Sequence, residues 1–80
     1  MEATDLVEAS ELFLELSGTN PGVEVWLDEG FTDGGWTYFW IVSRFGEAAI
    51  HNLAYVRLRN GQFQRRTYDE SGDDLWVDSK

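Results

Sequence analysis

Eighty residues suffice for one small domain, and 42% hydrophobic with 15% aromatic side chains is too apolar for a disordered chain. The absence of cysteine excludes disulfides and thiolate metal sites. The formal net charge of −9 favours basic partners and opposes binding to DNA or to anionic membranes.

The first predicted element is a helix over residues 4–17. An apolar stripe with helical spacing runs along it: Leu6, Ala9, Phe13 and Leu16. Glu8, Glu11 and Glu15 follow one another on the other side. Carboxylates one helical turn apart stand ~5–6 Å from each other, a spacing similar to that of phosphates along a nucleic-acid strand. Two interpretations remain open: a solvated acidic face, or a surface that mimics nucleic acid.

Five antiparallel strands in meander order are predicted within residues 23–78. Two-residue hairpin turns are predicted at Gly46–Glu47 and at Asn60–Gly61, and a flexible loop over residues 30–35. The fold class is therefore α+β, with the N-terminal helix packed on one face of a five-stranded sheet that is either flat or curled. All 80 residues are expected to form a single domain.

The predicted turns fix the register, and directly opposed residues share a face. One face is aliphatic and matches the helix: Phe39, Ile41, Phe45, Ile50, Ala54, Val56, Leu58 and Phe63. The other face is aromatic, with arginine and histidine among the rings: Trp36, Tyr38, Trp40, Val42, Leu53, Tyr55, Tyr68, Arg44, His51, Arg57, Arg59 and Arg66. Trp26 and Trp76 are assigned to it by residue type. One helix covers one face, so the aromatic face needs a second copy, another partner, or self-coverage by a curled sheet with arginine stems.

Patterns typical of an active site are lacking. His51 is the only histidine, and no serine lies in a G-x-S-x-G context. The acidic segment 68–74 departs from EF-hand spacing, and no phosphate-binding glycine motif is present. We expect no enzymatic activity, no metal and no cofactor.

We expect a small acidic, non-enzymatic protein-binding module. It acts as an inhibitor or nucleic-acid mimic on a basic protein surface, as phage anti-defence proteins, antitoxins and immunity proteins do, and it forms a homodimer. A cytoplasmic location without membrane insertion is expected, because no apolar run approaches ~20 residues and the first ten residues do not form a secretory signal. The expected partner-binding residues are Trp36, Tyr38, Trp40, Tyr55, Arg57, Arg59, Arg66, Tyr68, Glu8, Glu11 and Glu15. The alternative is a single-stranded nucleic-acid binder that stacks bases on the aromatic face.

Overall fold

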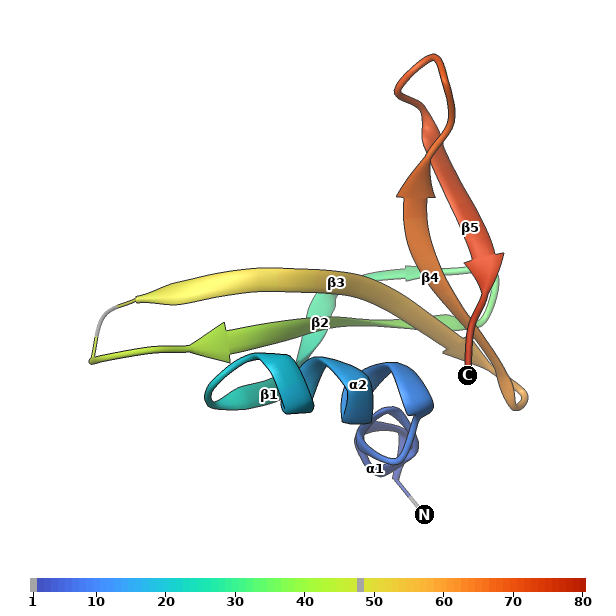
Figure 1. Cartoon of the computed structure of the whole chain (residues 1–80). Helices are drawn as coiled ribbons and strands as arrows, with labels where there is room; N and C mark the ends of the chain where they lie inside the picture. Colours follow the sequence, from blue (N-terminus) through green and yellow to red (C-terminus); the bar gives the residue numbers. More distant parts are fainter. Residues whose placement is uncertain (1, 48) are drawn as a thin grey trace.

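A computed structural model describes residues 2–47 and 49–80. Two short helices precede five strands: α1 (Ala3–Glu8), α2 (Glu11–Thr19), β1 (Val23–Asp33), β2 (Trp36–Arg44), β3 (Ile50–Arg59), β4 (Gln62–Tyr68) and β5 (Asp74–Asp78). The strands form one antiparallel meander sheet in the order β1-β2-β3-β4-β5 (Figure 1). The predicted α+β class is confirmed. Within the described residues, neither helix has the length and apolar content to cross a membrane.

The helix predicted over residues 4–17 is divided into two helices by Ser10. Ser10 has an extended backbone, with φ −70° and ψ 152°. Its hydroxyl donates to the carbonyl oxygen of Val7 (2.6 Å) and accepts from the N–H of Phe13 (3.1 Å), so it ends α1 and caps α2. The break changes which side of the segment faces the sheet. Val7 is fully buried, whereas Leu6 and Ala9 of the predicted stripe are exposed.

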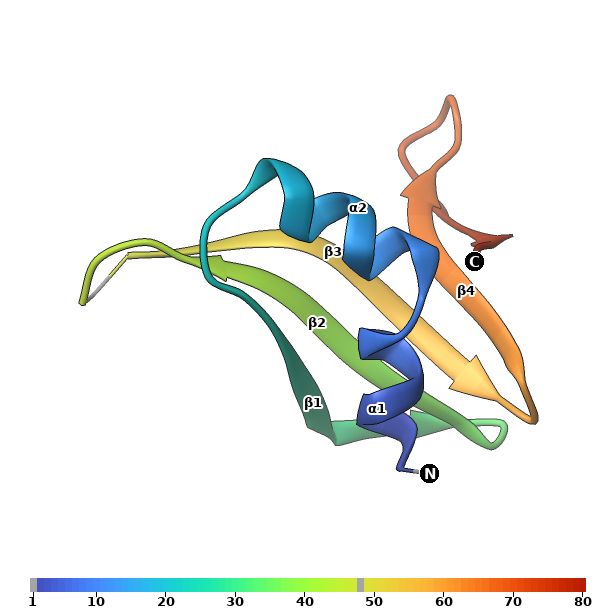
Figure 2. The same ribbon diagram turned by 60° about the horizontal axis from the view of Figure 1, so that its bottom comes forward.

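The core lies between the helices and the aliphatic face of the sheet. Its fully buried residues are Val7, Phe39, Ile41 and Val56, with Leu12, Phe13 and Leu16 of α2 packed against them. Figure 2 shows α1 and α2 lying across this face of the sheet. The chain's last residues join the layers: the N–H of Leu12 donates to the carbonyl oxygen of Lys80 (2.7 Å).

The turn at Asn60–Gly61 is confirmed, because both residues have positive φ (48° and 81°) and Arg59 pairs with Gln62. The loop predicted over residues 30–35 is wrong. β1 continues to Asp33, and Gly34 and Gly35, with φ of 60° and 81°, close a two-residue turn to β2. A register shift within β1, between Leu27 and Thr32, accommodates the extra residues of this strand.

The two-residue turn predicted at Gly46–Glu47 is also wrong. The N–H of Phe45 donates to the carbonyl oxygen of Ala49 (3.1 Å), so the connection is longer. Phe39 pairs with Val56 instead of Ala54, because the longer connection and a bulge at Leu53 each shift the register by one residue. This register differs from the predicted one by two residues, which leaves the face assignments of this central part unchanged.

A β-bulge in β3 reverses the faces beyond Ala54. Ala54 pairs with Ile41 but Asn52 pairs with Val42, so Leu53 is the extra residue and packs against the core instead of joining the aromatic face. Ile50 now lies opposite Arg44 on the aromatic side, and His51 lies opposite Ser43 on the helix side. Phe45 and Ile50, both predicted for the core, are exposed.

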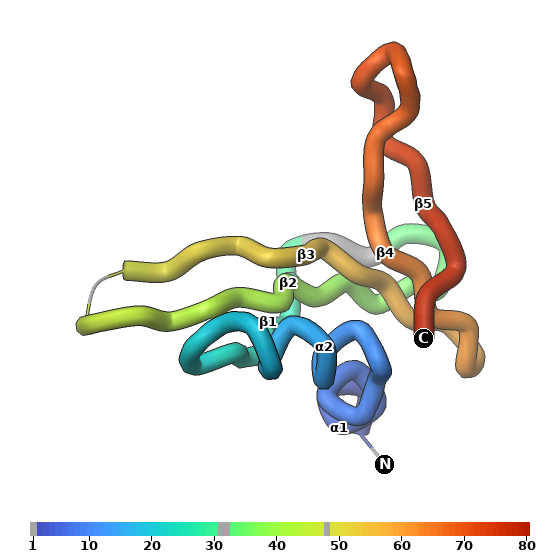
Figure 3. The backbone as a smooth tube through the Cα atoms, viewed as in Figure 1, coloured from blue at the N-terminus to red at the C-terminus, as the bar shows by residue number. Residues whose placement is uncertain are grey.

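The sheet bends strongly between β3 and β4. These strands pair only from Val56 to Arg59 with Gln62 to Arg65, and β4 then continues with β5 alone. Figures 1 and 3 show the β4–β5 hairpin rising away from β1, β2 and β3 on the side opposite the helices. The bend places β5 over the aromatic face.

Gly22 and Gly18 provide a matched test of this fold. Gly22 has φ +54°, and a Cβ there would lie 2.5 Å from the carbonyl oxygen of Arg44, whereas a Cβ on Gly18 of α2 meets nothing within 4 Å. We expect Gly22→Ala to lower the free energy of unfolding by about 2 kcal/mol or more. Gly18→Ala should raise it by up to about 1 kcal/mol, because alanine favours a helix. Urea unfolding measures both; equal midpoints for the two variants would contradict the tight approach at Gly22.

Candidate functional site

The bend of the sheet covers part of the aromatic face. The ring of Trp76, on β5, lies 5.6 Å from that of Tyr38 and 5.9 Å from that of Tyr55, centroid to centroid. Trp36 and Tyr38 are only 7% and 3% exposed. Of the alternatives given for this face, self-coverage by a curled sheet therefore applies to the inner part, where the chain covers itself.

Arg57 is held between two indole rings. Its Cζ lies 4.0 Å from the ring centroid of Trp36 and 4.2 Å from that of Trp76. Its Nε and Nη2 both donate to Oε1 of Gln64, at 2.8 and 2.6 Å, from the directly opposed position on β4. Arg59 also lies over Trp36, at 4.2 Å. Cation–π contact and hydrogen bonding thus engage Arg57 and Arg59, two of the three predicted partner-binding arginines, within the chain.

The outer part of the aromatic face is accessible. Trp40 and Tyr55 are in ring contact at 4.3 Å, and Tyr68 is 58% exposed. Arg66 joins these rings, with its Cζ 4.7 Å from the centroid of Tyr55, 5.6 Å from Tyr68 and 5.7 Å from Trp40. The four residues line a hollow of about 410 Å³ where β3 and β4 diverge. Of the eight predicted residues on the sheet, these four form a surface that a partner can reach.

Asp28 reaches the same region from β1. Its Oδ2 accepts a hydrogen bond of 2.7 Å from the phenol of Tyr55, two strands away. Burial raises the pKa of Tyr55 well above its usual value of 10.0, and the hydrogen bond and the negative charge of Asp28 raise it further. Arg66 opposes this shift. The contact fixes the Tyr55 ring at the edge of the hollow.

The predicted acidic residues lie on the helix layer. Glu8, Glu11 and Glu15 are all exposed, but Glu8 ends α1 while the other two belong to α2. The break at Ser10 therefore divides the expected row of carboxylates. Glu11 and Glu15 remain one helical turn apart on α2.

A second acidic group lies at the tip of the β4–β5 hairpin. There the Oδ1 of Asp69 accepts from the N–H groups of Ser71 (2.8 Å) and Asp73 (3.0 Å). This carboxylate organises the turn. Among the described residues, no group of three potential metal-ligating side chains is found. His51 is exposed, and the hydroxyl of Ser43 is buried and donates to the carbonyl oxygen of Pro21 (2.5 Å).

One ion pair occurs among the described residues. Nε of Arg44 lies 2.7 Å from Oε2 of Glu24, and this hydrogen bond lowers the pKa of Glu24 below its usual value. Both side chains are solvent-exposed, so the pair adds little to stability. All other carboxylate side chains except that of Asp28 are exposed and have no cationic partner within the described residues.

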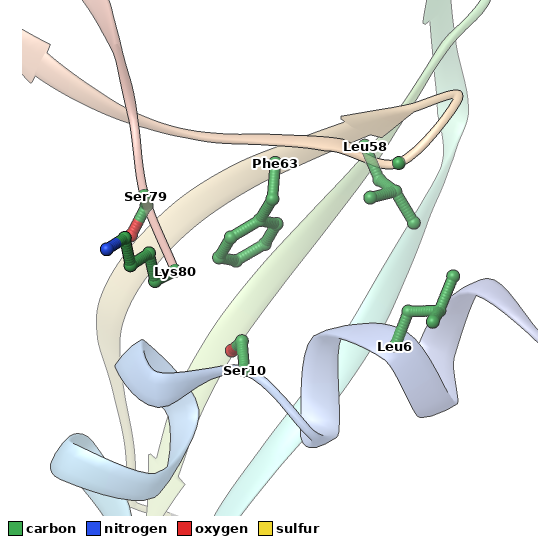
Figure 4. A pocket seen from close by; sticks show the side chains of 7 residues that line it. Leu6, Ser10, Leu58, Phe63, Ser79 and Lys80 are labelled. Atoms are coloured by element: carbon green, nitrogen blue, oxygen red, sulfur yellow. The ribbon is translucent and has the colours of Figure 1, made fainter.

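A further hollow of about 260 Å³ lies between α1 and the β3–β4 hairpin. Figure 4 shows Leu6 of α1, Leu58 of β3 and Phe63 of β4 around it, with Ser10 at the helix break. Its walls are mostly apolar, and it continues the core. Leu6 is 43% exposed here, which follows from the turn of the chain at Ser10.

Several residues of the site carried no recognisable signal in the sequence. Gln64 and Asp28 contribute through contacts with residues of other strands. The register shift in β1 that begins after Leu27, next to Asp28, cannot be recognised from the alternation of apolar residues in the sequence. Trp76 was assigned to the correct face, but its closure over Tyr38 depends on the bend of the sheet. No protein-family model, curated sequence or solved structure matches this chain.

The contact of Arg57 with two indoles can be tested by Arg57→Lys. Lysine lacks the planar guanidinium that stacks on both rings, so we expect a loss of about 1–2 kcal/mol in the free energy of unfolding. Arg65→Lys is the matched control, because Arg65 is exposed on the neighbouring strand, and it should change stability by less than about 0.5 kcal/mol. Urea unfolding followed by tryptophan fluorescence measures both. Equal losses of unfolding free energy in the two variants would show that stacking of the Arg57 guanidinium on the indoles does not stabilise the fold.

The raised pKa of Tyr55 predicts a loss of stability at alkaline pH. Above about pH 10 the unfolded chain ionises this phenol while the folded chain keeps it protonated, so stability is full below about pH 10 and falls above it. We expect the fall between about pH 9 and about pH 11 to be smaller in Tyr55→Phe. Asp28→Asn should lower the pKa of Tyr55 in an ultraviolet titration of the folded protein. An unchanged titration curve would refute the role of Asp28.

Proposed function

We propose that this chain is a small, non-enzymatic protein-binding module whose anionic surface engages a basic partner, as an inhibitor or nucleic-acid mimic would. The observation that carries the proposal is the different exposure of the two kinds of charge: Arg57, Arg59 and Arg66 are half-buried, whereas the carboxylate residues other than Glu24 and Asp28 are exposed. Four arginines lie over aromatic rings of their own chain: Arg44, Arg57, Arg59 and Arg66. The carboxylates are turned outward, and with a net charge of −9 they dominate the field that a partner meets.

The helix layer is the best candidate for the contact. Glu11 and Glu15 are one turn apart on α2, and Glu8 precedes them across the break. Repulsion between like charges at this spacing is relieved when a basic surface approaches. The carboxylates at the hairpin tip are less suited, since the Asp69 side chain is already engaged with its own turn.

The single-stranded nucleic-acid alternative has less support. Trp36 and Tyr38 are buried, and Arg57 and Arg59 are engaged internally, so fewer rings and cations are available for stacking bases and contacting phosphates. The expected homodimer stays a prediction, and the region around Trp40 and Tyr68 is its remaining candidate interface on this face. A cytoplasmic setting is part of the proposal, and the lack of cysteine is compatible with a reducing compartment.

Two charge-matched variants test the proposal. One replaces Glu8, Glu11 and Glu15 with glutamine; the other replaces Glu70, Asp73 and Asp74 with the corresponding amides, so both lose three negative charges. In affinity purification from the source cells, we expect a basic protein to bind the wild type and the tip variant at about 0.15 M salt, and to bind the helix variant at least tenfold less. Raising the salt to about 0.5 M should weaken the wild-type complex, because surface charges are then screened.

The control is the comparison of the two variants, since their net charges are equal. Equal loss of binding in both would mean that net charge alone retains the partner, and would refute a specific contact at the helix layer. Capture of nucleic acid in place of a basic protein would favour the alternative function.

A further inference from the structure

The divergence of β3 and β4 leaves half of β3 with an open edge. β4 pairs with β3 only from Val56 onward, so no described strand lies beside Ile50–Tyr55 on the side away from β2. Figure 3 shows the backbone of β4 rising away from this half of β3. An exposed strand edge is a ready site for pairing with another extended chain.

The hydrogen bonds of the neighbouring strands show which backbone groups are available. The N–H of Arg44 donates to the carbonyl oxygen of Gly22 (3.0 Å), so the backbone of Arg44 is turned toward β1. Ile50, its partner on β3, therefore turns its own N–H and C=O away from β2. By the two-residue period Asn52 does the same, which leaves donors and acceptors directed into the angle between β3 and β4.

The side chains beside this edge form a hollow with one charged group. Arg66 lines it together with Trp40, Tyr55 and Tyr68. The guanidinium lies over aromatic rings, and it makes no hydrogen bond or ion pair with any residue in the described parts of the chain. A guanidinium presents five N–H donors in a fork that matches a carboxylate.

We propose that the notch between β3 and β4 accepts an extended peptide segment of a partner protein, which pairs with the open edge of β3 at Ile50 and Asn52 and places a carboxylate side chain on Arg66. The paired stretch is short, because the bulge at Leu53 interrupts the edge. The rings of Trp40 and Tyr68 flank the inserted segment. The inference deepens the proposed function and rests on it in one respect, that the chain binds protein.

A peptide fits the notch better than the alternatives. The unpaired backbone N–H and C=O groups of β3 can form hydrogen bonds with the backbone of an extended peptide, whereas a nucleic acid has no series of donors and acceptors at this spacing. The net charge of −9 repels every phosphate of an oligonucleotide, whereas a peptide brings one carboxylate, and charges beyond about 8 Å are screened at physiological salt. A second copy of the chain would bring a whole sheet into an angle already bounded by β4 and β5 (Figure 1).

Selection from a display library of random peptides, about twelve residues long, on the full chain tests the inference. We expect enrichment of sequences with alternating apolar residues and one Asp or Glu. Binding of a selected peptide should fall at least tenfold in Asn52→Pro, which removes one outward N–H but leaves the β2–β3 ladder in place. Asn52→Ala retains the N–H and should bind within about twofold of the wild type, because the expected contact is made by the backbone.

Arg66→Gln should also weaken binding at least tenfold, and Arg65→Gln, on the neighbouring residue, should not. Because a variant with proline is at risk of poor folding, N-methylation of the selected peptide along its length gives a second measurement that leaves the protein unchanged; methylation at alternate positions should abolish binding.

Absence of enrichment, selected peptides without Asp or Glu, or full binding to Asn52→Pro would overturn the inference. Displacement of the peptide by oligothymidylate, or concentration-dependent dimerisation through the notch, would assign the site to a different occupant. These results concern the notch alone, so they are independent of the outcome for the helix-layer variants.

Discussion

The position of Arg57 between Trp36 and Trp76 is the interaction on which the rest of the architecture depends. The sheet of this protein is apolar on both faces, but the helices cover only one of them. The aromatic residues of the other face must therefore be shielded from water in another way. The guanidinium joins β3 to β5 across β4, with Gln64 as its hydrogen-bond acceptor. The sheet bends so that the β4–β5 hairpin forms a second layer, and the ring of Trp36 is covered without another helix.

This solution also determines the electrostatic character of the molecule. Arg57, Arg59 and Arg66 contact aromatic rings, a side-chain amide and a backbone carbonyl, and none of them forms an ion pair with a carboxylate of the described residues. Most carboxylates consequently face solvent, and Glu24 is the one that forms an ion pair within the described residues, although Arg65 and Lys80 line the same hollow as Glu11 and Glu15. The same bend that closes the inner aromatic face separates β4 from the first half of β3, so the covered cluster and the open notch have one structural cause.

Local signals made much of the fold predictable from the sequence. Asn60–Gly61 fixed the β3–β4 register, and alternation assigned most apolar residues to the correct face. The helix break at Ser10 is indicated in the sequence by a serine before an apolar run, which is a typical N-cap. The apolar stripe over residues 6–16 nevertheless favoured one continuous helix. The bulge at Leu53 and the closure of Trp76 over Tyr38 had none, because they arise from contacts between strands distant in sequence. The aromatic residues of the candidate site were therefore assigned to the correct face of the sheet, while the sequence did not indicate which part of that face the chain covers itself.

The hydrogen bond from Leu12 to Lys80 connects the beginning of α2 with the residues that follow β5. This contact spans most of the chain, and it forms only after the meander has brought its last strand back beside Phe63, whose carbonyl oxygen accepts from Ser79. Such closure over a long loop carries a large entropic cost and slows folding relative to the local hairpins. The start of α2 is therefore tied to the end of the sheet by a contact that depends on the whole meander, in addition to its packing on β2 and β3.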